Sequence, residues 1–337
     1  LISAYFLSLE GYKVDLYEKK TLLSETSSKT TKLIHGGIRY LENLQFHEVK
    51  NGINDRKWWL ENFPDETKLQ EIIILSKKKL SPEIFKFFFG IKVYETFAGR
   101  SNIKTGRLYK QDDLLSLGIK NNISAGISFY DGLMQESVGQ EIIKRCKSNG
   151  VNFYENNEIK SIRSEGHIEE KQYKKIIIAT GPWVSSFLKQ NKIDTNKTID
   201  YIKGSHLIIN RKIKKGLMFR DQKKHRYIFA LPYQGNLLLG TTEQRVRSPE
   251  DNHVLDSEVN YLLESINIYI DRPINKDEII KSFSGVRPLI KSKAQDFHSS
   301  SRDFYIQKDH NLLSLFGGKW TTAPSIARNI VRIVNNE

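Results

Sequence analysis

A polar segment followed by a pair of glycines stands out near the start of the chain. Residues 26–31 read Thr-Ser-Ser-Lys-Thr-Thr, and His35, the pair Gly36-Gly37 and Arg39 come soon after them. Hydroxyl groups donate hydrogen bonds to phosphate oxygens, and the planar arginine head group clamps anions. Paired glycines let the backbone approach a flat ligand closely. The segment could therefore hold a flat ligand that carries phosphate, although a polar loop before an N-capped surface helix would give the same pattern.

Three later residues could act on an anionic substrate. His206 ends the sequence Lys-Gly-Ser-His, and an imidazole can take a proton near neutral pH. Arg287 and Lys319 each follow what the sequence predicts to be a glycine turn, where a positive side chain could bind an anion. A structural histidine within a strand and ordinary solvated surface charges are the alternatives, and the residues alone leave them open.

The first elements that would position these groups are a helix and a strand. Residues 1–9 predict an apolar helix ended by Gly11, and residues 13–17 predict a strand that ends at Glu18. This order is typical of the second half of a dinucleotide-binding βαβ unit, in which the acid accepts hydrogen bonds from ribose hydroxyls. Glu18 is therefore the expected ribose ligand, with a solvated carboxylate as the alternative. The glycine fingerprint should lie just before Leu1, so we expect a chain truncated within the phosphate-binding turn.

Another strand ends in small residues. In residues 174–183, two lysines and three isoleucines are followed by Ala179, Thr180 and Gly181. An apolar run without alternation is typical of a parallel strand covered on both faces. The three small residues would leave room for a cofactor at the strand end. Many α/β proteins contain such a strand, so by itself it is moderate evidence for a cofactor site.

The second half of the chain has a sequence pattern typical of β-strands. Between residues 199 and 242, apolar and β-branched segments are separated by turn signals, which predicts an antiparallel sheet with residues 203–206 in its first strand. Near the end, a Gly-Gly turn leads to a helix capped by Thr321 or Thr322. Other expected elements are helices at 42–63, 82–97, 135–147 and 254–269, strands at 72–75, 127–130, 151–154, 159–163, 278–283, 303–307 and 312–316, and a turn at Asp131-Gly132.

Five stretches, in the same order and over essentially the whole chain, resemble FAD-dependent glycerol-3-phosphate dehydrogenases. They are residues 26–42, 179–183, 203–206, 284–289 and 316–322. The resemblance implies an α/β (α+β) fold, with an FAD-binding Rossmann-like domain of the glutathione-reductase type and an antiparallel-sheet substrate domain. The implied division gives FAD-binding parts at 1–70, 121–190 and 301–337, a helical insertion or substrate region at 71–120, and the substrate domain at 191–300.

The resemblance also implies an activity. It is oxidation of sn-glycerol 3-phosphate to dihydroxyacetone phosphate by hydride transfer to N5 of FAD, with the electrons passed to a quinone. The implied catalytic residues are His206, Arg287 and Lys319, with His35 as a second candidate base, and the implied substrate ligands are Arg39, Tyr40 and Arg302. The implied cofactor ligands are Glu18, Thr26, Ser27, Ser28, Lys32, Leu33, His35, Gly36, Gly37, Ala179, Thr180, Gly181, Gly317, Gly318, Lys319 and Thr321.

Two departures from the family pattern concern single positions. Ala323 and Pro324 replace the usual Tyr-Arg, and Pro324 still suits the first turn of a helix. Glu243 stands where the family has aspartate after two threonines, and we expect a structural role there. Two further function classes stay open: a related flavin oxidase of amines or 2-hydroxy acids, similar to D-amino-acid oxidase, and an inactive fragment or basic binding protein.

Composition limits the remaining possibilities. The 337 residues are 39% hydrophobic and 27% charged, as in ordinary globular proteins, and no apolar run is long enough to cross a bilayer. The net charge of +14 suggests anionic partners, but scattered lysines explain it as well. Cys146, the one cysteine, fits a reducing compartment and helix packing. We expect no metal site, no nucleic-acid partner, a cytoplasmic location with peripheral contact to the inner membrane face, and a homodimer.

Overall fold

The computed structural model describes residues 1–37, 46–78, 88–92, 96, 105–221, 226–291 and 304–336, with side chains from Val49 onward in the second of these ranges. Arg39, Tyr40 and Arg302, the three implied substrate ligands, lie outside the described residues. Most of the predicted helix at 82–97 also lies outside them.

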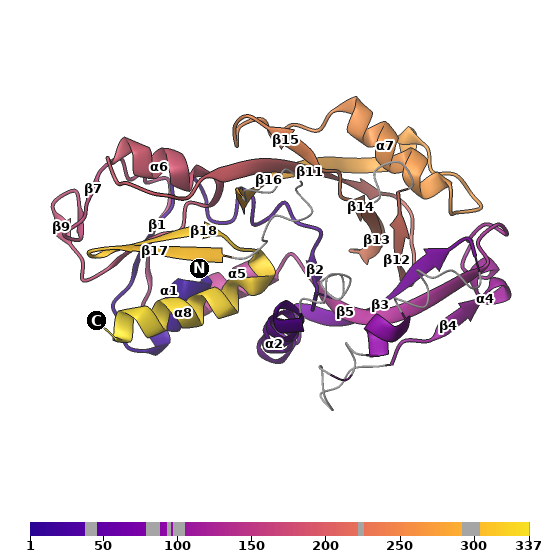
Figure 1. Cartoon of the computed structure of the whole chain (residues 1–337), viewed down its shortest axis with the longest axis horizontal. Helices are drawn as coiled ribbons and strands as arrows, with labels where there is room; N and C mark the ends of the chain where they lie inside the picture. The colour runs from indigo at the N-terminus through magenta and orange to yellow at the C-terminus, as the bar shows by residue number, and fades with distance from the viewer. Residues whose placement is uncertain are drawn as a thin grey trace.

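The strands form two groups that lie side by side (Figure 1). The first group contains two pairs of parallel strands and a small antiparallel meander. Its members are β1 (Asp15–Tyr17) with β6 (Asn152–Tyr154), β10 (Ile176–Ile178) with β18 (Leu312–Gly317) and β17 (Phe304–Asp309), and the meander β7 (Ile162–Arg163), β8 (His167–Ile168) and β9 (Lys171–Gln172). The predicted parallel strand is therefore confirmed as β10, because it pairs in parallel with β18.

The second group is one large mixed sheet. Its order is β15 (Gln244–Val246), β11 (Ile199–Ile209), β14 (Asn236–Gly240), β13 (Tyr227–Tyr233), β12 (Gly216–Arg220), β3 (Thr67–Ser76), β5 (Ala125–Met134) and β2 (Leu33–Ile34), with β16 (Ile279–Ile290) on β11 and β4 (Leu108–Lys110) on β5. All pairings in it are antiparallel except β12 with β3. The predicted antiparallel sheet is confirmed, and residues 203–206 lie in β11.

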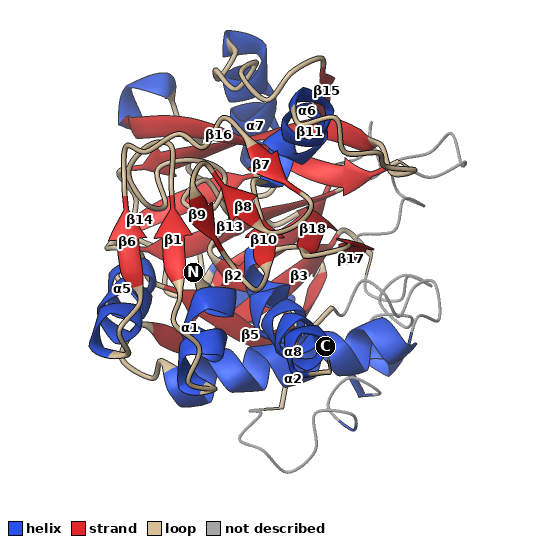
Figure 2. Ribbon diagram, turned by 90° about the vertical axis from the view of Figure 1, so that its left-hand side faces the viewer, coloured by secondary structure: helices blue, strands red, loops and turns tan. Residues whose placement is uncertain are grey.

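Helices cover these sheets from both sides (Figure 2). Four of them lie together in the lower part of that view: α1 (Ile2–Leu9), α2 (Phe46–Asn62), α5 (Val138–Ser148) and α8 (Ala323–Asn335). Two lie above, α6 (Val184–Gln190) and α7 (Asp256–Asn267). The short elements are α4 (Gln111–Leu115) and the 3₁₀ turns η2 (Gly181–Trp183), η3 (Lys276–Glu278) and η4 (Trp320–Thr322).

The closing helix α8 is amphipathic and packs against α1. Its buried residues Ile326, Ala327, Ile330 and Val334 recur at helical spacing, so they form one apolar stripe. Leu7 of α1 shares a buried cluster with this stripe. The helix begins after Thr322 and carries Pro324 in its first turn, as the sequence predicted. This packing fixes the direction in which the N-terminus of α8 points.

Two predicted turns are wrong, because both segments lie inside strands. Asp131 and Gly132 belong to β5, where Gly132 pairs with Ile34 of β2 and Asp131 is buried by an ion pair described below. Gly285 belongs to β16 and pairs with Gly204 of β11, so Arg287 projects from a strand and does not follow a turn. The Asp-Gly turn signal was outweighed in the first case by a buried partner.

The domain division stays a prediction, although one pairing bears on where its boundaries lie. Strand β5 lies wholly in the range assigned to the FAD-binding domain, yet it pairs along its whole length with β3 in the large sheet. Among the described residues, none of the helices is long and apolar enough to cross a membrane, and no cluster of side chains suits a metal ion. Cys146 is buried in the face of α5, as expected for a packing residue.

Candidate active site

Three glycines flatten one face of the large sheet around His206. A β-carbon on any of them would clash with a group that now lies over it. A β-carbon on Gly240 would meet the His206 ring, one on Gly204 would meet the Arg287 guanidinium and the Thr241 hydroxyl, and one on Gly285 would meet Lys29. The missing side chains therefore let two functional candidates and the polar loop lie directly on the sheet.

Strand alternation places these groups on a common face. In β11, His206 and Gly204 are two residues apart and so point to the same side of the sheet. Opposite them in β16, Phe283 pairs with His206, and Gly285 pairs with Gly204. Arg287 is two residues beyond Gly285, so its side chain belongs to the same face. The register of one strand pair thus brings His206 and Arg287 together.

His206 is sealed into this face as a neutral imidazole. It is 2% exposed, stacks on Phe283 at 5.0 Å between ring centres, and its Nε2 lies 2.9 Å from the hydroxyl oxygen of Thr31. Its Nδ1 is buried without a hydrogen-bond partner among the described residues. Burial, with smaller contributions from Arg287, Lys32 and Arg226, lowers the pKa of His206 to about 3.

The low pKa of His206 predicts a dependence of stability on acid. The unfolded chain, with a histidine pKa of about 6.5, takes up this proton before the native state does. Stability should therefore be unaffected above about pH 6.5 and should fall by at most about 1.4 kcal/mol per pH unit as the pH drops towards about 3. The variant His206→Gln lacks this group, so its unfolding free energy, measured in urea, should fall less steeply over that range.

A matched control for this experiment is His310→Gln, because the His310 side chain is 77% exposed. That variant should keep the wild-type slope of unfolding free energy against pH. Parallel losses of stability in wild-type protein and His206→Gln would contradict the assignment of a depressed pKa.

Arg287 shares a carboxylate with a second arginine that the sequence did not single out. Its Nη1 lies 3.1 Å from Oε1 of Glu243, and its Nη2 donates to the Thr241 hydroxyl at 3.0 Å. Arg226 reaches the other oxygen of Glu243 at 3.6 Å. The expectation that Glu243 has a structural role agrees with these contacts, since it holds two arginines beside His206.

The opposite face of β11 carries a buried polar network. Lys203 forms an ion pair of 2.8 Å with Glu258 of α7, and Ser205 and Thr242 donate to the same carboxylate at 2.9 and 2.6 Å. Burial works to raise the pKa of Glu258, but these hydrogen bonds together outweigh it and lower the pKa. The side chains of the Lys-Gly-Ser-His sequence thus alternate between the two faces of β11. Lys203 and Ser205 attach the strand to α7, and Gly204 and His206 face the candidate site.

The polar loop lies over β16 and reaches His206. Thr26 donates from its hydroxyl to the Val286 carbonyl at 3.1 Å, and Ser28 donates to the Glu25 carbonyl at 2.9 Å. The Lys32 ammonium, 8% exposed as a residue, donates to the Ser28 carbonyl at 2.8 Å, and burial lowers its pKa. Hydroxyls predicted to bind phosphate therefore also hold the loop on the sheet. Ser27 lies in the same loop, and Leu33 is buried at the start of β2.

The early diglycine turn is fixed by groups from β5 and α2. The Gly36 amide donates to Asp131 at 3.0 Å, and Arg56 pairs with the same carboxylate oxygen at 2.9 Å. Both side chains are almost fully buried, at 3% and 1% exposure. Gly52 of α2 packs on the turn, since a β-carbon there would lie 2.8 Å from the Gly36 oxygen. No sequence pattern pointed to this role of Asp131, which was predicted to lie in a turn.

The late diglycine turn rests on the same helix. Gly317 and Gly318 have positive φ values of 67° and 80°, as a tight turn of this kind needs. Trp59 of α2 donates from its indole nitrogen to the Thr321 carbonyl at 3.0 Å. Lys319 is the N-cap residue of η4, and its amide donates to the Thr322 hydroxyl at 3.0 Å.

Helix α2 therefore joins the two turns. Gly52 meets the early turn and Trp59 meets the late one, seven residues apart, which corresponds to about 10 Å along a helix. Asp55, between them, accepts a hydrogen bond from Ser325 in the first turn of α8 at 2.7 Å, and burial raises its pKa. The two diglycine turns thus share one supporting helix.

The residues around these turns fit a flavin. Gly37 has a φ of +85°, and the turn carries no side chains at Gly36 and Gly37 that would keep a flat ring away. The Thr321 hydroxyl oxygen is buried without a hydrogen-bond partner among the described residues, so it can serve a bound group. His35, partly buried, lies directly before this turn.

Two other predicted cofactor segments lie at strand ends in the first group. Ala179 and Thr180 are exposed after β10, and Gly181, with a φ of +57°, begins η2. Glu18 follows β1 and accepts the Lys20 amide at 2.9 Å. Ligands commonly bind beyond the carboxyl ends of parallel strands, so both positions suit a nucleotide.

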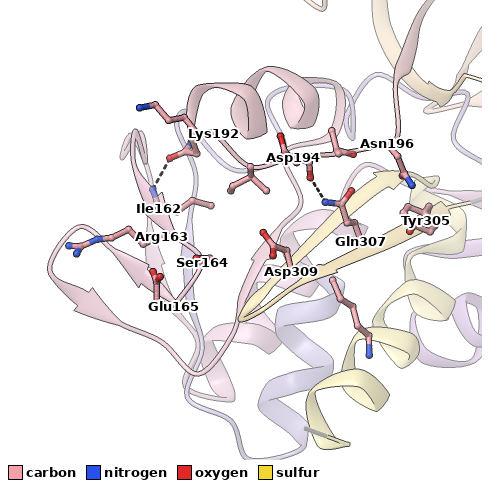
Figure 3. A pocket seen from close by; sticks show the side chains of 14 residues that line it. Ile162, Arg163, Ser164, Glu165, Lys192, Asp194, Asn196, Tyr305, Gln307 and Asp309 are labelled. Carbon is pink, nitrogen blue, oxygen red and sulfur yellow. Dashed lines mark hydrogen bonds between the residues drawn. The ribbon is translucent and has the colours of Figure 1, made fainter.

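A polar pocket of about 960 Å³ lies elsewhere (Figure 3). It is lined by β7, the segment after α6 and β17, and Gln307 donates across it to the Asp194 carbonyl at 2.6 Å. None of the predicted site residues lines this pocket. This pocket is therefore separate from the residues around His206.

The structure thus brings together His206, Arg287, Lys32 and the loop at residues 26–31, and separately places both diglycine turns on α2. Sequence reasoning missed the residues that hold them. These are Thr31, Gly52, Arg56, Trp59, Asp131, Gly204, Arg226, Gly240, Glu258, Phe283 and Gly285. Most are polar or small residues inside regular elements, where a sequence pattern indicates the element but not the partner.

Comparison with known proteins places this geometry among flavin enzymes. Residues 1–333 match the family described as FAD dependent oxidoreductase (DAO). Curated relatives include a glycerol-3-phosphate dehydrogenase of Pseudomonas tolaasii, 28% identical over 95% of this chain and 66% of the relative, and an aerobic glycerol-3-phosphate dehydrogenase of Staphylococcus saprophyticus, 29% identical over 97% and 63%. The chain therefore spans slightly less than two thirds of the length of these relatives.

Solved structures show the same fold. An L-alpha-glycerophosphate oxidase from Mycoplasma pneumoniae with FAD bound superposes with a TM-score of 0.77, at 21% identity over 99% of this chain and 91% of that one. A glycerol-3-phosphate dehydrogenase from Bacillus halodurans complexed with FAD gives 0.74, at 20% identity over 99% and 62%. Glycine oxidase from Geobacillus kaustophilus gives 0.76 at 15% identity over 100% and 91%. The predicted FAD-binding α/β fold is confirmed.

Proposed function

The chain belongs to the DAO family of FAD-dependent oxidoreductases, and from that premise we propose that it oxidises sn-glycerol 3-phosphate to dihydroxyacetone phosphate. The observation that carries the proposal is the cationic face around His206, where Arg287, Lys32 and Arg226 are all close enough to depress its pKa. A dianionic phosphate would be stabilised by such a set of positive charges. The curated relatives, named as glycerol-3-phosphate dehydrogenases, support the same substrate.

Arg287 is the proposed phosphate ligand in this arrangement. Its side chain is 33% exposed, against 7% for Arg226, so it is the outermost of the two arginines that share Glu243. A guanidinium can meet two phosphate oxygens at once. Arg39, Tyr40, Arg302 and Lys319 remain proposed partners of the substrate, the first three lying outside the described residues.

FAD, when bound, supplies the acceptor for the hydride from the substrate carbon. The proposed ligands of FAD are those predicted from the sequence, and the two glycine turns on α2 leave room for a flat ring. The Thr321 hydroxyl would offer that ring a hydrogen bond.

His206 remains the proposed acceptor of the hydroxyl proton. A pKa of about 3 makes it a weak base, which matches poorly with a proton transfer near pH 7. A bound phosphate dianion would offset the charges of Arg287, Lys32 and Arg226 and so raise this pKa, while burial would still oppose the charged form. His206 would therefore act as a base only when the anionic substrate is present.

Quinone as the electron acceptor, peripheral contact with the inner face of the cytoplasmic membrane and a homodimer are also proposed, by likeness to the family. Reduction of a soluble quinone by the reduced protein would test the first. Sedimentation with anionic vesicles would test the second, and light scattering of purified protein would test the third.

A flavin oxidase of amines or 2-hydroxy acids is the second candidate. The likeness in fold to glycine oxidase supports it, because the same fold serves a substrate with a carboxylate. A carboxylate carries one negative charge where a phosphate carries nearly two, so the number of cations near His206 favours phosphate.

The test of the proposed function is a substrate panel under anaerobic conditions. The purified protein should show flavin absorbance, and glycerol 3-phosphate should bleach it, whereas glycine, D-alanine and L-lactate should not. Bleaching by an amino acid or a hydroxy acid alone would favour the second candidate. A preparation without flavin that binds DNA or anionic vesicles would favour a basic binding protein.

A further inference from the structure

Two arginines beside His206, Arg226 and Arg287, share Glu243 as a counter-ion, and the three side chains differ in how deeply they are buried. The Arg226 side chain is 7% exposed, the Glu243 side chain 15%, and the Arg287 side chain 33%. Glu243 lies between the other two, at 3.1 Å from Arg287 and 3.6 Å from Arg226. One carboxylate thus connects a deep guanidinium to a shallow one.

The two arginines contact Glu243 unequally. The contact to Arg287 is short enough for a hydrogen bond, whereas the contact to Arg226 is an ion pair beyond hydrogen-bond distance. The Arg226 Nε is buried and has no hydrogen-bond partner among the described residues. A buried donor without a partner is costly, so Arg226 has unused capacity for a carboxylate.

We propose that Glu243 is a movable counter-ion, which neutralises Arg287 when the site holds no anion and transfers to Arg226 when an anion binds Arg287. In the second state the carboxylate would bind Arg226 through both Nε and Nη2, the paired geometry that guanidinium groups favour. The buried donor would then be satisfied, which offsets part of the loss of the Arg287 contact. The identity of the anion as a substrate phosphate rests on the proposed function.

This exchange would give the site a preference for dianions. An incoming anion and Glu243 compete for the same position beside the Arg287 guanidinium. The anion must therefore attract Arg287 more strongly than Glu243 does. A carboxylate carries the same charge as Glu243, so it has little advantage in the competition. A phosphate carries nearly two charges and should displace Glu243 more readily.

The test is binding of inorganic phosphate to the flavin-loaded protein, measured by titration calorimetry, in variants of the two partners. Glu243→Gln removes the competing charge and should tighten phosphate binding about tenfold. It should also tighten acetate binding, so that the preference for phosphate over acetate falls. Arg226→Gln removes the alternative partner, holds Glu243 on Arg287, and should weaken phosphate binding about tenfold.

The combined variant separates an exchange from a general effect of charge. When Glu243→Gln is already present, adding Arg226→Gln should weaken phosphate binding only about twofold, because no carboxylate needs a new partner. Glu278→Gln is the matched control: it removes one negative charge from an ion pair with Arg211 at the far end of β11, 2.7 Å long, and should leave phosphate binding unchanged.

Weaker or unchanged phosphate binding by Glu243→Gln would overturn the proposal, since Glu243 would then only hold Arg287 in place. Glu243→Gln alone decides the matter should Arg226→Gln fail to fold. The substrate panel tests the proposed function separately. If the phosphate affinities follow the expected pattern but glycerol 3-phosphate does not reduce the flavin, the counter-ion exchange stands and the proposed substrate is wrong.

Discussion

Replacement of Arg287 by alanine is expected to lower kcat/KM for glycerol 3-phosphate by about 100-fold, or about 2.7 kcal/mol of transition-state stabilisation. The guanidinium is the outer member of the arginine pair and is the proposed ligand of the phosphate. Hydrogen bonds to charged groups contribute more than neutral ones, so the loss should appear chiefly as a higher KM. Anaerobic flavin reduction at increasing substrate concentration would measure it.

Arg245→Ala is the matched control, because Arg245 lies on β15, next to β11, and pairs with Asp200 at 2.9 Å with 53% exposure of its side chain. An exposed pair of this kind contributes little, and turnover should stay within about twofold of wild type. Unchanged turnover and KM in Arg287→Ala would show that the substrate phosphate does not bind at this face of the sheet.

Replacement of Arg56 by methionine is expected to lower the unfolding free energy by about 3–5 kcal/mol. It would remove the positive charge that Arg56 places 2.9 Å from the carboxylate of Asp131, whose side chain is 1% exposed. Because Asp131 accepts the Gly36 amide, the early diglycine turn should shift and the protein should lose bound flavin. Urea unfolding and the ratio of flavin to protein absorbance would measure the two effects.

The double variant Arg56→Met with Asp131→Asn tests the cause of that loss. Asparagine keeps an oxygen for the Gly36 amide and removes the buried charge, so most of the stability should return. Arg145→Met serves as control, since Arg145 lies over the Phe63 ring and forms a less buried ion pair with Glu141 of the same helix, with side-chain exposures of 29% and 23%. Equal losses of stability in the single and double variants would show that packing of the Arg56 stem is responsible.

Local patterns in the sequence determined most of the regular elements. The apolar run at residues 176–179 predicted a buried parallel strand, and pairing of β10 with β18 confirms it. The Gly-Gly turn followed by a threonine cap predicted α8, and the alternation after residue 199 predicted β11 with Lys203 to His206 inside it. These features depend on local residue patterns, which a single segment carries by itself.

Partners across the fold were decided only by the tertiary structure. Glu243 and Arg287 are 44 residues apart in the chain, and Arg56 and Asp131 are 75 apart. A strand pattern fixes which residues share a face but not which strand lies next to it, because register depends on the pairing of the whole sheet. The same limit explains the wrong turn at Asp131, whose burial depends on an arginine from α2.

The sequence by itself therefore determined the family, the order of elements and the residues that could do chemistry. Only the packed chain decided that glycines at 204, 240 and 285 would let those residues lie flat on one sheet, and that α2 would support both diglycine turns. The physical reason is that local propensity acts within a few residues, whereas close approach between distant segments depends on the volume left between them after folding.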